Sequence, residues 1–151
     1  MYSKPIGHGD ESGGEFAKEM LKGDATFGIN FDRIQWHTKA NRYVIIEYLL
    51  CDEKQFANGV TPYTSHPNRY YDKNSMKFLS LWKLAKKLDA VLYLVNYSKK
   101  GTQYEDQVLL MEVQHIDPSL SPVVKTTDYK LTREQYSDWF RELNKCGGVP
   151  P

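Results

Sequence analysis

Cysteine is scarce in this sequence, and long hydrophobic runs are absent. The 151 residues include two cysteines, Cys51 and Cys146, which lie far apart and match neither a zinc-binding nor a redox spacing. We therefore expect reduced thiols in a cytoplasmic protein, with a single disulfide as the alternative. The apolar stretches fall well short of the roughly 20 residues that a membrane span needs. The first residues, MYSKPIGHGDESGG, also lack the apolar core of a secretory signal. No membrane partner is expected.

An excess of charge of one sign is also missing. The chain has 20 Lys and Arg against 19 Asp and Glu, for a net charge of +1, so no global basic field indicates a nucleic-acid partner. This near-zero balance favours a role that depends on a partner over a free-standing DNA enzyme. The length and the 40% hydrophobic content fit one globular domain with a real core. We expect a single domain over residues 1–151, with flexible segments at 1–11 and 146–151.

The first third of the chain predicts a helix followed by a pair of strands. Ser12 is placed to cap a helix over residues 15–21. Apolar side chains alternate in ATFGINFDRIQW, residues 25–36, as in a strand, and change phase near Asp32, as at a bulge or a strand end. The run RYVIIEYLLC, residues 42–51, is apolar on both faces, which is typical of a central strand. The polar residues between these two strands predict a hairpin turn.

The rest of the chain predicts two helices and further strands. Residues 52–75 have the composition of a long loop, which is usually functional or mobile. The later elements are a helix in SMKFLSLWKLAKKL, strands in AVLYLVNYS and QVLLMEVQHI, an additional strand near residues 123–130, and a helix in LTREQYSDWFREL with a Thr132–Gln135 capping box. The predicted order, α-β-β-α-β-β-α, indicates an α/β fold with a mixed central sheet flanked by helices.

Glu47 is the one carboxylate inside the apolar run of residues 42–51. Burying an unpaired carboxylate costs on the order of several kcal/mol, so Glu47 must reach solvent, have a partner or hold a metal. In a hairpin with its turn near Lys39, facing residues have numbers that add up to about 79, which places Asp32 opposite Glu47. Two carboxylates about 5 Å apart suit a shared Mg²⁺. The alternative is an ordinary salt bridge for each acid, with three arginines available: Arg33, Arg42 and Arg69.

The element order, with Asp32 on one strand and Glu47 on the next, resembles the PD-(D/E)xK, or restriction-endonuclease-like, nuclease superfamily over residues 12–145. The resemblance implies a restriction-endonuclease-like core and a Mg²⁺- or Mn²⁺-dependent endonuclease that acts on DNA rather than RNA. It also implies metal ligation by Asp32 and Glu47, with Glu15 of the first helix as a third ligand and Glu19 as the alternative to it. One position departs from the family pattern, because Leu49 stands where the family has its lysine.

Related enzymes supply that lysine from a neighbouring helix, and Lys77 is the candidate here. It lies at the edge of the apolar face of its helix and in the first turn, where a cation gains nothing from the helix dipole. A lysine placed against both preferences indicates a local anion, whereas the alternative is a side chain that extends to solvent along the core. The expected catalytic residues are therefore Asp32, Glu47 and Lys77.

The loop sequence SHPNRYY supplies the expected contacts to substrate. Asn68, Arg69 and Tyr70 combine an amide, a phosphate-binding fork and a stacking ring. The alternative is a polar turn set by Pro67.

Two other functions stay open beside the nuclease. One is a catalytically silent module on the same fold that binds nucleic acid or protein, such as a phage or mobile-element accessory factor. The other is a subunit that forms a homodimer through its aromatic surface.

Overall fold

The computed structural model describes residues 11–151, which belong to two compact units, one ending at Asn30 and the other running from Phe31 to Pro151. The described part of the first unit contains helix α1, Ser12–Leu21, none of whose residues is buried. Glu11 rather than Ser12 occupies the N-cap position, and the helix begins three residues before its predicted start at residue 15. Residues 1–10, part of the segment predicted to be flexible, lie outside the described residues.

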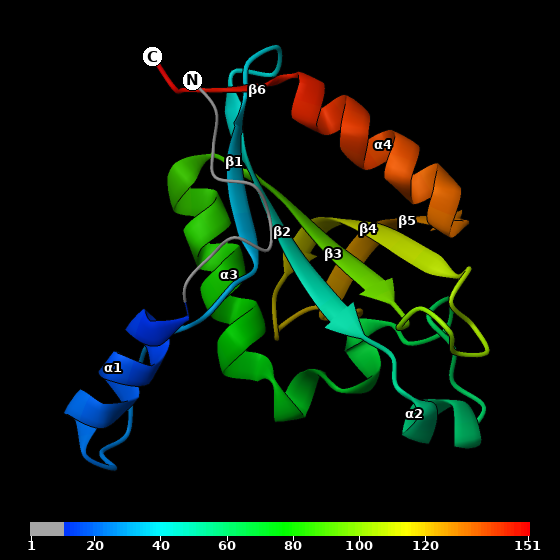
Figure 1. Cartoon of the computed structure of the whole chain (residues 1–151), viewed down its shortest axis with the longest axis horizontal. Coiled ribbons are helices and arrows are strands. Elements are labelled where there is room, and N and C mark those ends of the chain that lie inside the picture. The colour runs from blue at the N-terminus through cyan, green and yellow to red at the C-terminus, as the bar shows by residue number, and fades with distance from the viewer. Residues whose placement is uncertain (1–10) are drawn as a thin grey trace. The chain divides into compact units, whose positions relative to one another are not determined.

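The larger unit is built on a six-stranded mixed sheet with the order β5-β4-β3-β2-β1-β6 (Figure 1). The strands are β1 Arg33–His37, β2 Arg42–Leu50, β3 Val91–Tyr97, β4 Val108–Ile116, β5 Val124–Leu131 and β6 Gly147–Gly148. Only β2 and β3 pair in parallel among the described strands, and the other neighbours are antiparallel. The chain is therefore an α/β protein with a mixed sheet flanked by helices, as the hydrophobic pattern predicts.

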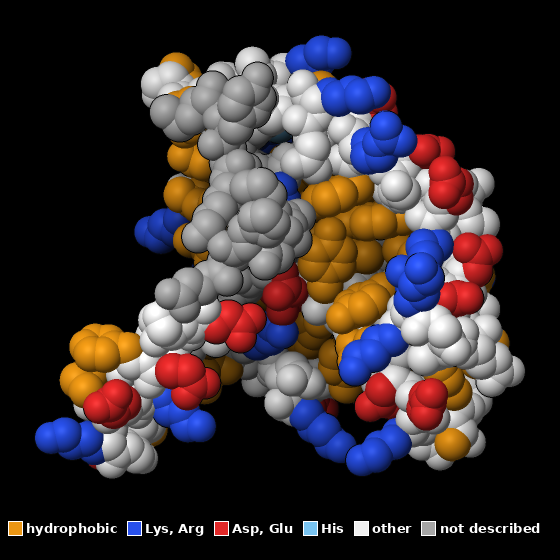
Figure 2. Space-filling model, in the orientation of Figure 1, with side chains coloured by type: hydrophobic (Ala, Val, Ile, Leu, Met, Phe, Trp, Pro, Cys, Tyr) orange, Lys and Arg blue, Asp and Glu red, His pale blue; other side chains and the backbone are white. Residues whose placement is uncertain are grey.

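Two helices, α3 (Ser75–Leu88) and α4 (Arg133–Lys145), cover opposite faces of this sheet. On the α3 face, Ile45 and Leu94 pack against Phe78 and its neighbours. On the α4 face, Ile46 and Val95 pack against Leu143. Because side chains alternate along a strand, the fully apolar pattern of β2 is explained by this cover on both sides. Figure 2 shows hydrophobic side chains gathered on the visible face of the sheet beside α4, with Lys and Arg side chains at the rim.

The strand predicted over residues 25–36 is wrong for its first eight residues, 25–32. Only residues 33–37 form strand β1, and residues 25–31 have no regular structure. Phe27, whose alternation with Ile29 suggested a strand, is 89% exposed. An alternating pattern becomes a strand only where a partner strand accepts its hydrogen bonds, and β2 offers partners only to residues 33–37.

The C-terminal segment predicted to be flexible is ordered at its start. Gly147 and Gly148 form β6 and pair with the outer edge of β1. The approach is close, since a Cβ atom on Gly148 would lie 2.8 Å from Thr38 Oγ1. A larger residue at this position would force the Thr38 side chain to shift, and the short strand covers an otherwise open sheet edge.

The predicted long loop of residues 52–75 contains local structure instead of open coil. It holds helix α2, Glu53–Ala57, and two 3₁₀ turns at Pro67–Arg69 and Tyr71–Lys73. Both cysteines are free, as expected. The capping box of α4 is also present. Among the residues that the structure describes, no helix has the length and apolar character that crossing a bilayer requires.

Candidate functional site

The hairpin of β1 and β2 has the register that the sequence predicts. Arg33 pairs with Ile46 and His37 with Arg42, so the numbers of facing residues add up to 79 (33 + 46 and 37 + 42). Continued by one residue, this register places Asp32 opposite Glu47. Asp32 itself lies at a bend directly before β1, and the expectation that it sits within the strand is corrected by one position.

Asp32 and Glu47 are held together by two hydrogen bonds between side chain and backbone. The Asp32 N–H donates to Glu47 Oε2 at 3.1 Å, and the Tyr48 N–H donates to Asp32 Oδ2 at 2.8 Å. The hydrogen bonds of Asp32 thus extend the β1–β2 hairpin by one residue beyond the paired residues Arg33 and Ile46. Asp32 is exposed, whereas Glu47 is only 3% exposed. The two acids lie side by side, one at the surface and one beneath it.

Lys77 occupies the third position of this site. It lies in the first turn of α3, and its ammonium group forms an ion pair with Glu47 Oε1. The Glu47 side chain is 4% exposed and the Lys77 side chain 36%, so the pair spans the boundary between core and solvent. The placement of Lys77 in its helix predicts a nearby anion, and the Glu47 carboxylate is that anion. We call Asp32, Glu47 and Lys77 the acid–lysine cluster.

The arginines considered as partners for the two acids are engaged elsewhere or exposed. Arg42 contacts Asp89, with 3.5 Å between Nη2 and Oδ1, and Arg33 donates to Gln35 and Asn144. Leu49, two residues after Glu47 in β2, packs into the core beneath α3. The positive charge beside Glu47 therefore comes from the helix that covers this face and not from the strand.

The electrostatics of Glu47 are a balance of opposing effects. Burial raises the pKa of the Glu47 carboxyl above its ordinary value, and the nearby charge of Asp32 adds to this increase. The hydrogen bond and charge of Lys77 and the Asp32 N–H lower the pKa, without cancelling the effect of burial. The carboxylate is thus a costly buried anion for which Lys77 compensates only in part. An additional cation at this position would relieve the remaining cost.

Hard oxygen donors at this site are suited to Mg²⁺ or Mn²⁺. Among residues 11–151, no three His, Cys, Asp or Glu side chains converge as a ready-made metal site. Mg²⁺ nevertheless uses only one or two protein carboxylates and completes its shell with water and phosphate oxygens. Asp32 and Glu47 meet that requirement in donor chemistry. Glu15 lies on α1 in the other compact unit, and its role as a third ligand stays a prediction.

Removal of the lysine charge should make stability depend on pH. We expect Lys77→Met to destabilise the fold by about 2 kcal/mol at pH 8, below the 3–5 kcal/mol of a fully buried pair because Lys77 is partly solvated. A carboxyl whose folded pKa is raised destabilises the fold as pH rises above its ordinary pKa of about 4.3. Loss of Lys77 raises the Glu47 pKa further, so the deficit should shrink toward pH 4.

Urea denaturation at several pH values measures this effect. Lys145→Met is the matched control, because Lys145 forms an exposed ion pair with Glu142 at 2.8 Å on α4. It should show no resolvable change, since exposed pairs contribute little. A deficit of Lys77→Met that is the same at pH 4 and pH 8 would contradict the assignment of a compensating charge.

The SHPNRYY loop is largely used to build the fold. The Asn68 side-chain amide donates to Val124 O and accepts from Val124 N–H, both at 2.8 Å, and so pairs with β5 like a strand residue. Tyr70 packs against the core beside Phe78, and burial raises its pKa to about 12. Arg69 is exposed, and its side chain forms no hydrogen bond or salt bridge among the described residues, whereas its backbone N–H donates to His66 O at 2.9 Å. Of the three expected substrate contacts, Arg69 alone presents a charge to solvent.

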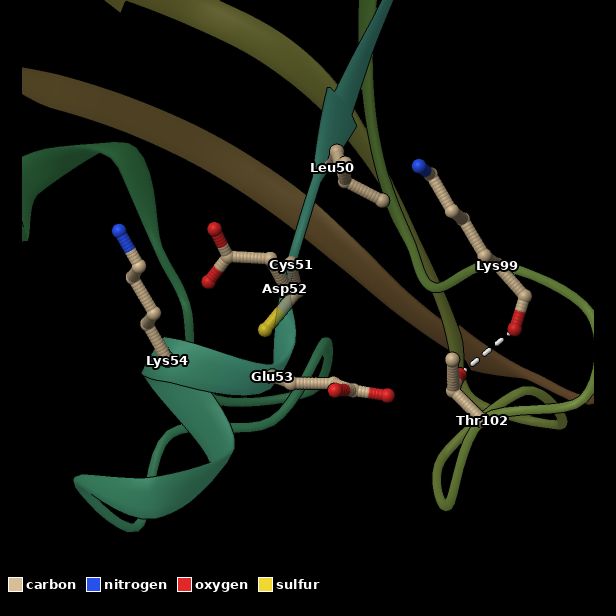
Figure 3. Close-up of a pocket in the computed structure, with 7 residues that line it drawn as sticks. All are labelled: Leu50, Cys51, Asp52, Glu53, Lys54, Lys99 and Thr102. Carbon is tan, nitrogen blue, oxygen red and sulfur yellow. Dashed lines mark hydrogen bonds between the residues drawn. The ribbon is translucent and has the colours of Figure 1, made fainter.

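A pocket of about 420 Å³ lies just beyond the carboxyl end of β2, and the sequence reasoning missed it. It is lined by residues from the end of β2, from α2 and from the loop after β3: Leu50, Cys51, Asp52, Glu53, Lys54, Lys99 and Thr102. Figure 3 shows Lys54 on one side of this pocket and Lys99 on the other. The available sequence signal for this pocket was the run of charged residues Asp52, Glu53 and Lys54 directly after the apolar strand β2. Ligands bind near the carboxyl ends of parallel strands.

Cys51 does not make this pocket a nucleophilic site. Burial raises the pKa of its thiol to about 11, and Sγ lies 3.7 Å from Val60 O as a hydrogen-bond donor. At neutral pH the residue is a protonated, structural thiol.

The chain was compared with protein-family models, with curated proteins and with solved structures, and none of the three comparisons found a match.

Proposed function

We propose that this protein is a divalent-metal-dependent nuclease that hydrolyses phosphodiester bonds, in DNA rather than RNA, on a restriction-endonuclease-like core. The observation that carries the proposal is the ion pair of Lys77 with the buried carboxylate of Glu47, next to Asp32. The PD-(D/E)xK pattern requires two acids and a lysine at one point of a sheet. Here the lysine comes from α3 instead of β2, and the three groups still meet.

Each group has a distinct role in this proposal. Asp32 and Glu47 would hold Mg²⁺ or Mn²⁺, with the Tyr48 carbonyl as a further ligand. A metal held there would polarise the scissile phosphate and lower the pKa of a nearby water. Lys77 would position the attacking water or stabilise the negative charge that develops on the phosphate. Its partly exposed side chain is suited to this role, because the ammonium touches both the buried acid and the solvent side.

Substrate contact would rest mainly on Arg69. Its guanidinium is exposed and presents the planar fork that binds phosphate oxygens. Asn68 and Tyr70 would support it from within the fold, since their side chains hold the loop against β5 and the core. With a net charge of +1, the chain lacks a broad basic surface, so a bound partner protein or a second copy would add to the binding of DNA.

Metal dependence is the direct test of this proposal. We expect the purified chain to cleave duplex DNA in Mg²⁺ or Mn²⁺ and to lose this activity in EDTA, because two acids without a cation repel the phosphate. Supercoiled plasmid, linear duplex and single-stranded RNA should be compared by gel electrophoresis. Cleavage that persists in EDTA, or its absence with every metal and substrate, would count against a metal-dependent nuclease.

A catalytically silent binding module is the second candidate. It is favoured by one observation, that both oxygens of Glu47 already have protein partners, namely Lys77 and the Asp32 N–H. Calorimetric titration with Mn²⁺ separates the two. Binding that disappears in Asp32→Asn supports the nuclease, whereas no binding supports a module that grips nucleic acid, another protein or a second copy of this chain.

A further inference from the structure

The opposite face of the sheet contains a smaller pocket between the strands and α4, unrelated to the acid–lysine cluster. Its volume is about 210 Å³, more than the roughly 150 Å³ cavity that binds benzene in an engineered protein. Six of its lining side chains come from β3, β4, β5 and α4: Tyr93, Leu110, Glu112, Tyr129, Leu131 and Trp139. Three of these carry aromatic rings and one carries a carboxylate.

The aromatic rings form adjoining walls. The Tyr93 and Trp139 rings have centroids 5.0 Å apart and planes at 75°. Tyr129, on β5, is 48% exposed and lines the same space. The π faces of Tyr and Trp attract cations, and several rings around one space are the usual means of binding quaternary ammonium groups.

Glu112 supplies a carboxylate that forms no salt bridge with a cation of residues 11–151. Its carboxylate accepts from Tyr93 Oη at 3.4 Å and from Gln114 Nε2 at 3.2 Å, and no Lys or Arg among the described residues forms a salt bridge with it. Burial, and after it the charge of Glu112, raises the pKa of Tyr93 to about 12, so this phenol stays neutral. The guanidinium of Arg42, which acts on Tyr93 in the opposite sense, is bound to Asp89.

We propose that this pocket binds an organic cation of the trimethylammonium type, with Tyr93, Tyr129 and Trp139 around the head group and Glu112 as its counter-charge. A half-buried carboxylate among aromatic rings, without a cation of its own, is complementary to a bulky cation that donates no hydrogen bonds. The head group comes either from a free small molecule or from a trimethylated lysine side chain of a partner.

Titration of the full chain with choline tests the proposal, followed through the indole N–H resonance of Trp139 by NMR. Trp139→Phe assigns this signal among the three tryptophans. We expect a saturable shift with choline, and binding at least about tenfold weaker for 3,3-dimethylbutan-1-ol, which has the same shape without the charge. A short peptide with trimethyl-lysine forms the second arm, and the tighter of the two probes identifies the source.

Two variants alter the pocket through substitutions that should leave the fold intact. Glu112→Gln preserves shape and should weaken choline about tenfold, and Tyr129→Leu, at an exposed strand position, should also weaken it. Glu142→Gln, an exposed glutamate on α4, should bind as the unmodified chain does. The proposal is overturned if neither probe saturates, if the neutral analogue binds equally well, or if Glu112→Gln leaves affinity unchanged.

Discussion

Glu47→Gln should reduce DNA cleavage by a factor on the order of 10²–10³, at least the scale on which the loss of one preorganised hydrogen-bond donor acts in an active site. The substitution keeps the shape of the side chain and removes the charge that would hold the metal. Lys77→Met should cause a loss of similar order, and Lys77→Arg should recover part of it, because a guanidinium keeps the charge but not the position. Initial cleavage rates in Mn²⁺ measure all three variants.

The exposed Glu142–Lys145 pair provides the matched controls for this experiment. It repeats the chemistry of the Glu47–Lys77 pair on the surface of α4, with side chains 71% and 66% exposed. Glu142→Gln and Lys145→Met should cleave at the unmodified rate. If Glu47→Gln retained full activity while its fold was intact by circular dichroism, the acid–lysine cluster would not be the catalytic site, and the cleavage would have to be assigned to another part of the chain.

Phe78→Ala should destabilise the larger unit by about 3–5 kcal/mol, which is a large part of the total stability of a domain. Phe78 is 1% exposed and contacts the rings of Tyr70 and Tyr71, with centroids 5.8 Å and 6.4 Å away. Truncation leaves a cavity between α3 and the loop that precedes it. The midpoint of urea denaturation, followed by tryptophan fluorescence, measures the loss.

Met76→Ala is the control on the same helix, two residues away and 60% exposed, and should change stability little. The comparison also bears on function, because Phe78 fixes the helix turn that presents Lys77. At a temperature where Phe78→Ala is still folded, its cleavage rate should fall, because the helix turn that presents Lys77 is then held less firmly. A loss of stability below about 1 kcal/mol would show that this side chain does not anchor α3.

The hydrophobic periodicity of the sequence was sufficient to predict most of the regular structure. The helix over residues 75–88 was predicted with its observed bounds, because its apolar side chains recur at helical spacing. The hairpin register followed from the position of the turn alone, since a turn at residues 38–41 dictates which residues of β1 and β2 face each other. Local signals decide such features because the interacting residues are close in the chain.

The failures came where a distant partner decides the outcome. The alternation of residues 25–31 did not become a strand, because no neighbouring strand accepts its hydrogen bonds. Gly147 and Gly148 looked like a frayed end, yet they pair with β1, more than 100 positions earlier. Nothing local indicates that the amide of Asn68, whose role as a substrate contact stays a prediction, pairs with the backbone of Val124 in β5.

By itself, the sequence determined that Glu47 is a carboxylate in a buried strand, that Asp32 faces it, and that Lys77 is misplaced for an isolated helix. Only the tertiary structure decided that the Lys77 ammonium meets the Glu47 carboxylate, because α3 packs on the face of β2 from which Glu47 projects. Likewise, the rings of Tyr93, Tyr129 and Trp139 gather around Glu112 only through the pairing of β3, β4 and β5 under α4. The charge and shape of each side chain follow directly from the sequence, whereas contacts between remote positions require the packed fold.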